Sequence, residues 1–161
     1  MPAELVKEFL NRNRVRYTSI AHSTAYTAQE IAALSHTPGK ELAKTVIVEI
    51  DGALVMAVLS SSQQIDLPLL KEAAGGKAIR LVNESEFEGC FPDCATGAMP
   101  PFGNLYGMPV FAEESLARDK EIAFNAGSHN ELIRLAYEDF ETLVRPTIAK
   151  FSRPRNARVA A

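Results

Sequence analysis

Two apolar runs, KTVIVEI (residues 44–50) and ALVMAVL (residues 53–59), follow each other with only Asp51-Gly52 between them. An Asp-Gly pair between two such runs is typical of a β-hairpin, because both positions of a type I′ turn need a positive φ. Apolar residues are almost continuous in each run, which indicates strands that are buried on both faces. The sequence therefore predicts a central β-hairpin around which the other elements pack.

Upstream of the hairpin, the pattern predicts a helix, a strand and a second helix. Apolar residues fall on one face of a helix over residues 3–13, and residues 15–20 alternate with the period of a half-buried strand. Thr27 and Glu30 have the spacing of a capping box, which predicts a helix from residue 27 to residue 34. Thr37-Pro38-Gly39 then predicts a loop that leads into the hairpin.

Downstream of the hairpin, the clearest element is a helix over residues 67–74, with Pro68 in its first turn and Gly75-Gly76 at its end. A strand (78–82), a short helix (84–88) and two strands (109–112 and 121–125) are expected next, whereas residues 132–136 fit either a strand or a helix. Residues 139–149 are expected to be helical with a break or kink at Pro146, and the arginine-rich end, 152–161, is expected to fray. This order predicts one domain, residues 1–161, with a mixed or mostly antiparallel sheet surrounded by helices, not a doubly wound parallel sheet.

The composition is that of a globular domain. The chain has 161 residues, of which 47% are hydrophobic and 23% charged, and these values argue against disorder, collagen and coiled coils. No apolar run approaches the roughly 20 residues of a transmembrane helix, and the N-terminus lacks the apolar region of a signal peptide. Because only two cysteines are present, we expect a cytoplasmic protein with reduced thiols.

The net charge of −3 is unusual for a protein that binds nucleic acid, since such domains are commonly basic. The charges are unevenly distributed, however. Residues 81–150 carry 5 basic and 12 acidic residues, whereas residues 151–161 carry three arginines and no acid. A local basic surface is therefore compatible with the sequence, although the total charge does not require one.

The common catalytic motifs are absent from the sequence. It has no Gly-x-Ser-x-Gly elbow, no phosphate-binding Walker loop, no Gly-x-Gly-x-x-Gly and no His-Glu-x-x-His. Cys90 and Cys94 form one Cys-x3-Cys pair, whereas a closed zinc site needs four ligands. We therefore expect two reduced cysteines and no metal.

Three features could contribute to a binding site. Lys44, at the start of an apolar strand, is either a solvated strand-end lysine or an anchor for an anionic group such as phosphate. In the loop GAMPPFG (97–103), Gly97 permits close approach of the backbone to a ligand, and the prolines fix amide directions that could point at an oxyanion; a plain rigid turn fits equally well. His129, in the glycine turn NAGSHN, is either a surface residue or a hydrogen-bonding or acid/base group.

Taken together, three of these stretches resemble the YbaK-type aminoacyl-tRNA deacylases, the free-standing relatives of the editing domain in bacterial prolyl-tRNA synthetase. They are Lys44 at the head of KTVIV, the Gly97-x-x-x-Pro100 loop that continues as PFG, and IAFNAG at 122–127. The resemblance covers residues 3–150. It implies an α/β fold with a mixed, mostly antiparallel curved sheet or barrel of six to seven strands surrounded by helices, in which residues 131–136 are a strand.

The resemblance also implies an activity. The protein would be a trans-editing enzyme that hydrolyses the ester between a wrong small amino acid (Ala, Ser, Thr or Cys) and the 3′-terminal adenosine of a tRNA. It would use no cofactor and no metal. Its partners would be the acceptor end of aminoacyl-tRNA and, as a further partner, an aminoacyl-tRNA synthetase, but no DNA and no membrane. Two alternatives remain: a non-catalytic relative that binds aminoacyl-tRNA or a synthetase, and a hydrolase of another small acyl ester.

The residues that match the family's motifs would have distinct roles. Lys44 would anchor the phosphate or ribose of the terminal adenosine, and backbone amides around Gly97 and Pro100 would hold the carbonyl or the attacking water. An aminoacyl ester is already activated, so no covalent intermediate is needed, and the neighbouring ribose hydroxyl can assist the water. The residues expected to line the substrate pocket are Tyr26, Thr45, Ile47, Ala98, Met99, Pro101, Phe102, Gly103, Gly127, Ser128 and His129. The bases expected to contact the tRNA, provided that they share a face, are Lys40, Lys71, Lys77 and Arg80.

Overall fold

The computed structural model describes residues 4–24, 30, 33 and 39–154. Its elements are α1 (Glu4–Arg12), β1 (Tyr17–Ala21), the 3₁₀ helix η1 (Gly39–Glu41), β2 (Ala43–Ile50), β3 (Ala53–Ser60), β4 (Gln63–Ile65), α3 (Leu67–Ala74), β5 (Ile79–Leu81), α4 (Glu84–Phe87), η2 (Glu88–Cys90), η3 (Gly103–Leu105), β6 (Val110–Glu113), η4 (Glu114–Arg118), β7 (Glu121–Asn125), β8 (Glu131–Ala136), α5 (Tyr137–Val144), β9 (Thr147–Ala149) and β10 (Ser152–Pro154). Apart from Glu30 and Ala33, the helix predicted over 27–34 lies outside the described residues.

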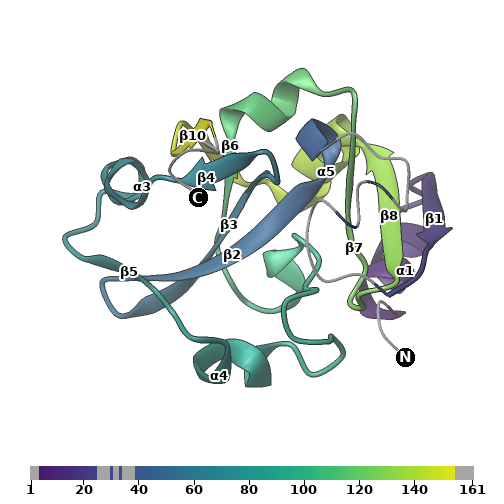
Figure 1. Ribbon diagram of the computed structural model, residues 1–161, viewed down its shortest axis with the longest axis horizontal. Coiled ribbons are helices and arrows are strands. Elements are labelled where there is room, and N and C mark those ends of the chain that lie inside the picture. Colours follow the sequence, from purple (N-terminus) through teal and green to yellow (C-terminus); the bar gives the residue numbers. More distant parts are fainter. Residues whose placement is uncertain (1–3, 25–29, 31–32, 34–38, 155–161) are drawn as a thin grey trace.

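The central hairpin is confirmed. β2 and β3 pair in antiparallel register from Ala43–Ser60 to Ile50–Ala53, and the turn residues Asp51 and Gly52 have φ angles of 49° and 86°. These two left-handed positions are the ones that an Asp-Gly turn supplies. The hairpin forms the middle of a five-stranded sheet with the order β5-β2-β3-β6-β9 (Figure 1).

Gly52→Ala is expected to lower the free energy of unfolding by about 1 kcal/mol, because an L residue is strained at a φ of 86°. No atom lies within 4 Å of a Cβ built at this position, so the effect isolates the backbone conformation from steric clash. Urea denaturation measures it. Gly89→Ala is the matched control: a Cβ there also meets open space, but the backbone is not left-handed, and no loss of stability is expected.

A second sheet, with the order β1-β8-β7, stands beside the first one, and a short third sheet pairs β10 with β4. Residues 131–136 are a strand, as the family resemblance implies. Most pairs are antiparallel, but β3–β6 and β6–β9 are parallel. The α/β class with a mixed, mostly antiparallel sheet is thus confirmed. The structure differs from the expected six to seven strands, because the described residues form ten strands. These strands make three sheets that do not close into a barrel.

The predicted helix over 139–149 is wrong beyond Val144. α5 ends there, Arg145 takes a left-handed conformation with a φ of 52°, and residues 147–149 form β9 beside β6. Pro146 cannot donate a backbone hydrogen bond and disfavours the helical region for the residue before it, so the helix stops instead of bending.

The prediction of a frayed end from residue 152 is wrong for residues 152–154. These residues form β10, which pairs with β4, a strand that was not predicted. The preceding Phe151 is fully buried, and its backbone N–H donates to a carboxylate oxygen of the buried Glu113 at 2.6 Å. One apolar side chain therefore fixes this segment, whereas residues 155–161 lie outside the described part.

Two hydrophobic clusters lie on the two faces of the central hairpin. The larger cluster fills the space between the two main sheets and includes Ile47, Met56 and Phe124 together with residues of α1 and α5. The smaller cluster, which includes Val48 and Leu70, lies under α3. Figure 1 shows α3 on one side of the molecule and α1 with β8 and β1 on the other.

Candidate functional site

One edge of β2 is only partly paired, and Lys44 lies on this stretch. β3 covers the other edge along its whole length, but on this side β5 pairs only with residues 48–50, and a single parallel bridge joins Leu42 to Ala123 of β7. Between these two contacts, neither β5 nor β7 forms a ladder with residues 43–47. We call residues 43–47 the open edge.

The strand registers place two connecting segments along the open edge. β7 runs parallel to β2 from the Leu42–Ala123 bridge, so Asn125 is level with Lys44 and the turn at Gly127 comes next. β5 is antiparallel to β2, and its last paired residue, Leu81, lies opposite Val48. The chain therefore moves away from β2 after Leu81 and then enters α4. The turn after β7 and the start of α4 therefore flank the open edge.

The Gly97 loop is held against this turn by three hydrogen bonds. Ala95 N donates to Gly127 O at 2.7 Å, and Gly127 N donates to Ala98 O at 2.9 Å. His129 Nε2 lies 2.9 Å from Thr96 O, which fits a ring that donates from Nε2 to this carbonyl. The structure thus brings the predicted residues Gly97, Gly127 and His129 together, although about 30 positions separate the loop from the turn.

Gly97 is the point where three segments meet. It has a φ of 86°, and a Cβ placed on it would lie 3.6 Å from His129 Cε1 and 3.8 Å from Glu84 Oε1. Ser128, in the neighbouring turn, donates from its hydroxyl to Asn130 Oδ1 at 2.8 Å. Thr96 and Gly97 are the exposed residues of the loop, and its later residues are buried. A ligand can therefore approach the backbone of the loop at Gly97.

The rest of the loop is embedded in the core. Ala98, Met99, Pro100 and Pro101 are buried, and the Phe102 ring is fully buried beside the rings of Phe9, Phe124 and Phe140, at centroid distances of 6.1, 5.5 and 5.9 Å. The backbone of Gly103 is equally crowded, because a Cβ there would lie 2.6 Å from a Val110 methyl and 2.8 Å from Met108 O. Phe102 and Gly103, predicted to line the substrate pocket, make core contacts that fix the position of the loop.

The predicted residues of β2 divide between its two faces. Thr45 and Ile47 lie on the face of the larger cluster, to which Met99 also belongs. By the alternation of the strand, Lys44 is on the opposite face with Val46, and it is half-buried beside Leu59. Lys44 thus lies on the open edge but not on the face that packs against the loop. Tyr26, the remaining predicted pocket residue, lies outside the described residues.

The four predicted tRNA-binding bases do not come together. Lys40 is on η1, before β2, whereas Lys71, Lys77 and Arg80 are near the far end of β2, about 26 Å away along its eight residues. Arg80 is also engaged by two carboxylates, at 3.1 Å from Glu49 and 2.8 Å from Glu86. Its hydrogen bonds lower the pKa of Glu86 to about 2, so the pair stays charged across the physiological range.

Both cysteines are free thiols, and Cys94 contacts Tyr106 and Asp93. Tyr106 donates from its hydroxyl to Asp93 Oδ1 at 2.9 Å and lies 3.4 Å from Cys94 Sγ. Burial raises the pKa of the Cys94 thiol to about 11. The Cys94 thiol is therefore protonated at neutral pH, although a metal ligand must be a thiolate. Among the described residues, no three His, Cys, Asp or Glu side chains gather as a metal site would require.

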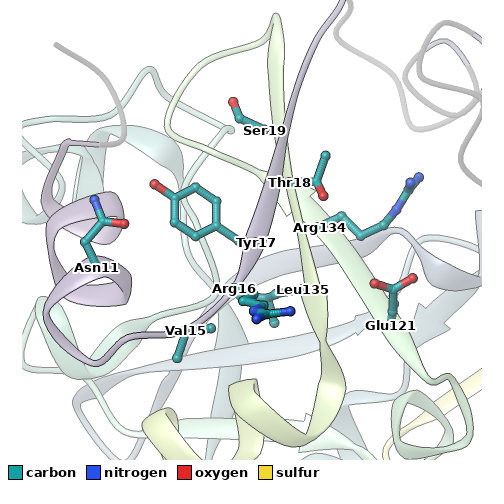
Figure 2. Close-up of a pocket in the computed structure, with 9 residues that line it drawn as sticks. All are labelled: Asn11, Val15, Arg16, Tyr17, Thr18, Ser19, Glu121, Arg134 and Leu135. Carbon is teal, nitrogen blue, oxygen red and sulfur yellow. The ribbon is translucent and has the colours of Figure 1, made fainter.

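The described residues also form cavities away from the loop and turn. One, of about 720 Å³, follows the edge strand β1 and is lined by Arg16, Tyr17, Glu121 and Arg134 among others (Figure 2). It reaches the first residue of β7, but none of its lining residues belongs to the open edge. A second, of about 520 Å³, lies between α1 and the segment that contains Pro92 and Tyr106. A third, of about 270 Å³, lies at the start of β2. No helix in the described part of the chain has the length and apolar character needed to cross a membrane.

Residues 22–143 match the aminoacyl-tRNA editing domain family. The chain belongs to this family. Among curated proteins, this member of the editing-domain family is 26% identical over 149 residues to the multifunctional Ser/Thr-tRNA deacylase ProXp-y of Escherichia coli K12, with 89% of each chain covered; the protein of E. coli O157:H7 gives the same values. The family resemblance drawn from the sequence is confirmed.

Solved structures support the fold. The hypothetical protein APE2540 superimposes with a TM-score of 0.84 at 22% identity, covering 93% of this chain and 100% of that one. A candidate trans-editing enzyme for prolyl-tRNA synthetase gives a TM-score of 0.80 at 20% identity, covering 94% and 96%. At these identities the two structures show that the fold is shared.

Two residues of this region were missed by sequence reasoning. Glu84 approaches Gly97 from the start of α4, and no sequence signal marks it. Asn125 ends β7 at the level of Lys44, and its buried side-chain oxygen has no hydrogen-bond partner among the described residues. The motif IAFNAG contains Asn125, so this residue could have been singled out as a polar group at the end of an apolar strand.

Proposed function

We propose that this protein is a cytoplasmic, free-standing editing enzyme that hydrolyses the ester bond of tRNA mischarged with a small amino acid. The observation that supports it best is the junction of the Gly97 loop, the Gly127 turn and the open edge, in a chain that belongs to the aminoacyl-tRNA editing domain family. Serine and threonine are the first substrates to test, because the E. coli relative is named a Ser/Thr-tRNA deacylase.

The proposed reaction is addition of water to the ester carbonyl. A tetrahedral oxyanion forms and collapses, releasing the amino acid and the 3′-terminal adenosine hydroxyl of the tRNA. Lys44 would anchor the phosphate or ribose of that adenosine. The Ala98 amide already donates to Ala95 O, Met99 is buried, and Pro100 and Pro101 have no N–H, so the amide of the exposed Gly97 is the group that we assign to the carbonyl oxygen or the water.

Deacylation of a panel of mischarged tRNAs tests the proposed function. Ser-, Thr-, Ala- and Cys-tRNA species are incubated with the protein, and the surviving ester is followed by acid gel electrophoresis. We expect rapid loss of at least one species, Ser- or Thr-tRNA first. If no ester is lost faster than in buffer, the proposed deacylase activity is wrong. The alternative, a non-catalytic protein that binds aminoacyl-tRNA or a synthetase, is then favoured.

The salt dependence of deacylation is expected to reveal direct contact with the tRNA backbone. Each neutralised phosphate contributes about −0.7 to −0.9 to the slope of log kcat/KM against log salt. For two or three contacts, kcat/KM should fall about tenfold between 50 and 200 mM KCl. Seryl-adenosine, which has no backbone phosphate, is the control ester, and its cleavage should change little. A flat response with tRNA would contradict direct contact and indicate recruitment by a synthetase.

A further inference from the structure

We propose that the small pocket at the start of β2 binds a phosphate of the RNA backbone near the 3′ end of the substrate; this inference rests on the proposed function. The pocket has a volume of about 270 Å³ and lies between η1, the end of β3, β4 and η4. We call it the η1–η4 pocket. Lys40, one of its residues, is four positions before Lys44 in the chain, and Ser60, another, pairs with Ala43.

Every residue that lines the η1–η4 pocket has a polar side chain. Two side chains are cationic, Lys40 and Arg118; the others are those of Ser60, Ser62, Gln63, Ser115 and Asp119. Pockets for drug-sized ligands are mostly apolar and have volumes of about 300–1,000 Å³. A smaller space with cations and hydroxyls suits a compact, strongly hydrated anion instead, and phosphate has this character.

The two cations of the pocket take no part in the ion pairs among the described residues. Neither Lys40 nor Arg118 forms an ion pair with another described residue, in contrast to Arg80, which two carboxylates hold. The lining holds two cations and one acid, Asp119. Burial raises the pKa of Asp119, the charge of Lys40 opposes this shift, and the charge of the neighbouring Glu41 adds to it. An anion at this site therefore meets two cations that are not held in ion pairs with the acids nearby.

Hydrogen bonds hold the neutral groups in place. The hydroxyl of Ser115 donates to Gln63 Oε1 at 2.8 Å, which leaves the side-chain NH₂ of Gln63 as a donor. Ser60 donates from its hydroxyl to Gly39 O at 3.3 Å, and the 2.7 Å hydrogen bond between the Ser60 and Ser62 hydroxyls is then donated by Ser62. Ser60 is only 5% exposed. The side-chain NH₂ of Gln63 is therefore held in place as a donor beside the two cations, which lowers the entropic cost of binding an oxyanion.

The position of the pocket points to the substrate's own backbone as the source of the phosphate. Lys40 is at most about 13 Å from Lys44 along the chain, which is within reach of nucleotides that adjoin a terminal adenosine at the open edge. The basic groups near the far end of β2 are about twice as distant. One chain of RNA can thus contact Lys44 and the η1–η4 pocket together.

Binding of uncharged tRNA to the double variant Lys40→Gln/Arg118→Gln tests the proposal without any catalytic step. The dissociation constant is measured by fluorescence anisotropy at several salt concentrations. We expect about a tenfold weaker affinity for each cation removed, and a salt slope shallower by about 0.7, as the loss of one phosphate contact requires. Arg12→Gln/Arg145→Gln is the control: it removes two exposed positive charges elsewhere and should leave affinity and slope nearly unchanged.

Chemically modified tRNAs, compared with the double variant, identify the phosphate that the pocket contacts. tRNAs that carry one uncharged methylphosphonate near the 3′ end are compared with unmodified tRNA, using the wild type and the double variant. When the methylphosphonate replaces the contacted phosphate, the wild type should bind the modified tRNA as weakly as the double variant binds unmodified tRNA. The double variant should bind the two tRNAs with the same affinity. Additive losses at every position would overturn the proposal. Thermal unfolding of both variants confirms that they fold.

Two further outcomes keep this proposal apart from the proposed function. If the double variant binds tRNA weakly as expected but the wild type deacylates nothing, the pocket is supported and the enzymatic function fails. If the wild type deacylates mischarged tRNA and the double variant binds as tightly as the wild type, the pocket proposal fails and the function stands. A titration of the wild type with inorganic phosphate, up to about 10 mM, is the second experiment, and NMR chemical shifts of Arg118 report binding of the ion. If these shifts change but the double variant binds tRNA as tightly as the wild type, the pocket binds free phosphate and the proposal is overturned.

Discussion

Lys44→Ala is expected to reduce kcat/KM for deacylation by about 10²–10³-fold, the usual cost of removing one positioned charged or hydrogen-bonding group from such a site. The physical reason is that a compact ammonium at the open edge fixes the terminal nucleotide relative to the Gly97 amide, and small misplacements of a bound ester strongly slow its reaction. Single-turnover deacylation with excess enzyme measures the effect on chemistry apart from product release.

Two controls accompany the Lys44 variant. Lys150→Ala removes an exposed lysine from the segment before Phe151 and should change kcat/KM less than twofold. Lys44→Arg keeps the charge but not the geometry, and it should recover only part of the activity. If Lys44→Ala retains wild-type activity, Lys44 is a strand-end lysine without a role in the reaction.

Phe102→Ala is expected to lower the free energy of unfolding by about 3–5 kcal/mol, which is the typical cost of truncating a buried aromatic side chain. The ring is fully buried, and three other aromatic rings surround it. Since domains are stable by only about 5–15 kcal/mol, a large part of the total would be lost. Urea denaturation measures the change. Leu81→Ala, at a side chain that is 53% exposed, is the control and should stay within about 0.5 kcal/mol.

The same position separates a core role from a pocket role. Phe102→Leu retains most of the apolar volume, so the protein should fold and keep the amino-acid preference of the wild type. A stable Phe102→Ala protein with altered preference between Ser-tRNA and Thr-tRNA would instead place the ring in the substrate pocket.

Local signals accounted for the elements that the sequence predicted well. The Asp51-Gly52 turn fixes the register of the hairpin within a few residues, and Pro68 and Gly75 mark both ends of α3. β9 and β10 were missed because three-residue strands carry almost no periodicity of their own. β9 is defined by its contact with β6, and β10 by its contact with β4 and the burial of Phe151. Such strands depend on tertiary partners that a local pattern does not contain.

The candidate site was predictable only where a motif marked it. Gly97, Gly127 and His129 lie in motifs, and the structure brings them together. The four lysine and arginine residues were grouped by charge alone, and the length of β2 separates Lys40 from the others. Phe102 shows that a residue inside a motif can also pack in the core, where its ring is fully buried. Sequence neighbours share a motif, but only the fold decides which of them face a ligand.

The parallel pairing of β3 with β6 affects how the chain emerges during translation. A hairpin forms within microseconds, so β2 and β3 can pair soon after Ser60 has left the ribosome. The partner for the second edge of β3 ends at Glu113, 53 residues later. At a translation rate of about 5–20 residues per second, synthesis of these residues takes about 3–10 s, and during this time the second edge of β3 is not yet paired with β6. Codon usage and chaperone occupancy over this interval would therefore influence the yield of folded protein more than the same changes near either end of the gene.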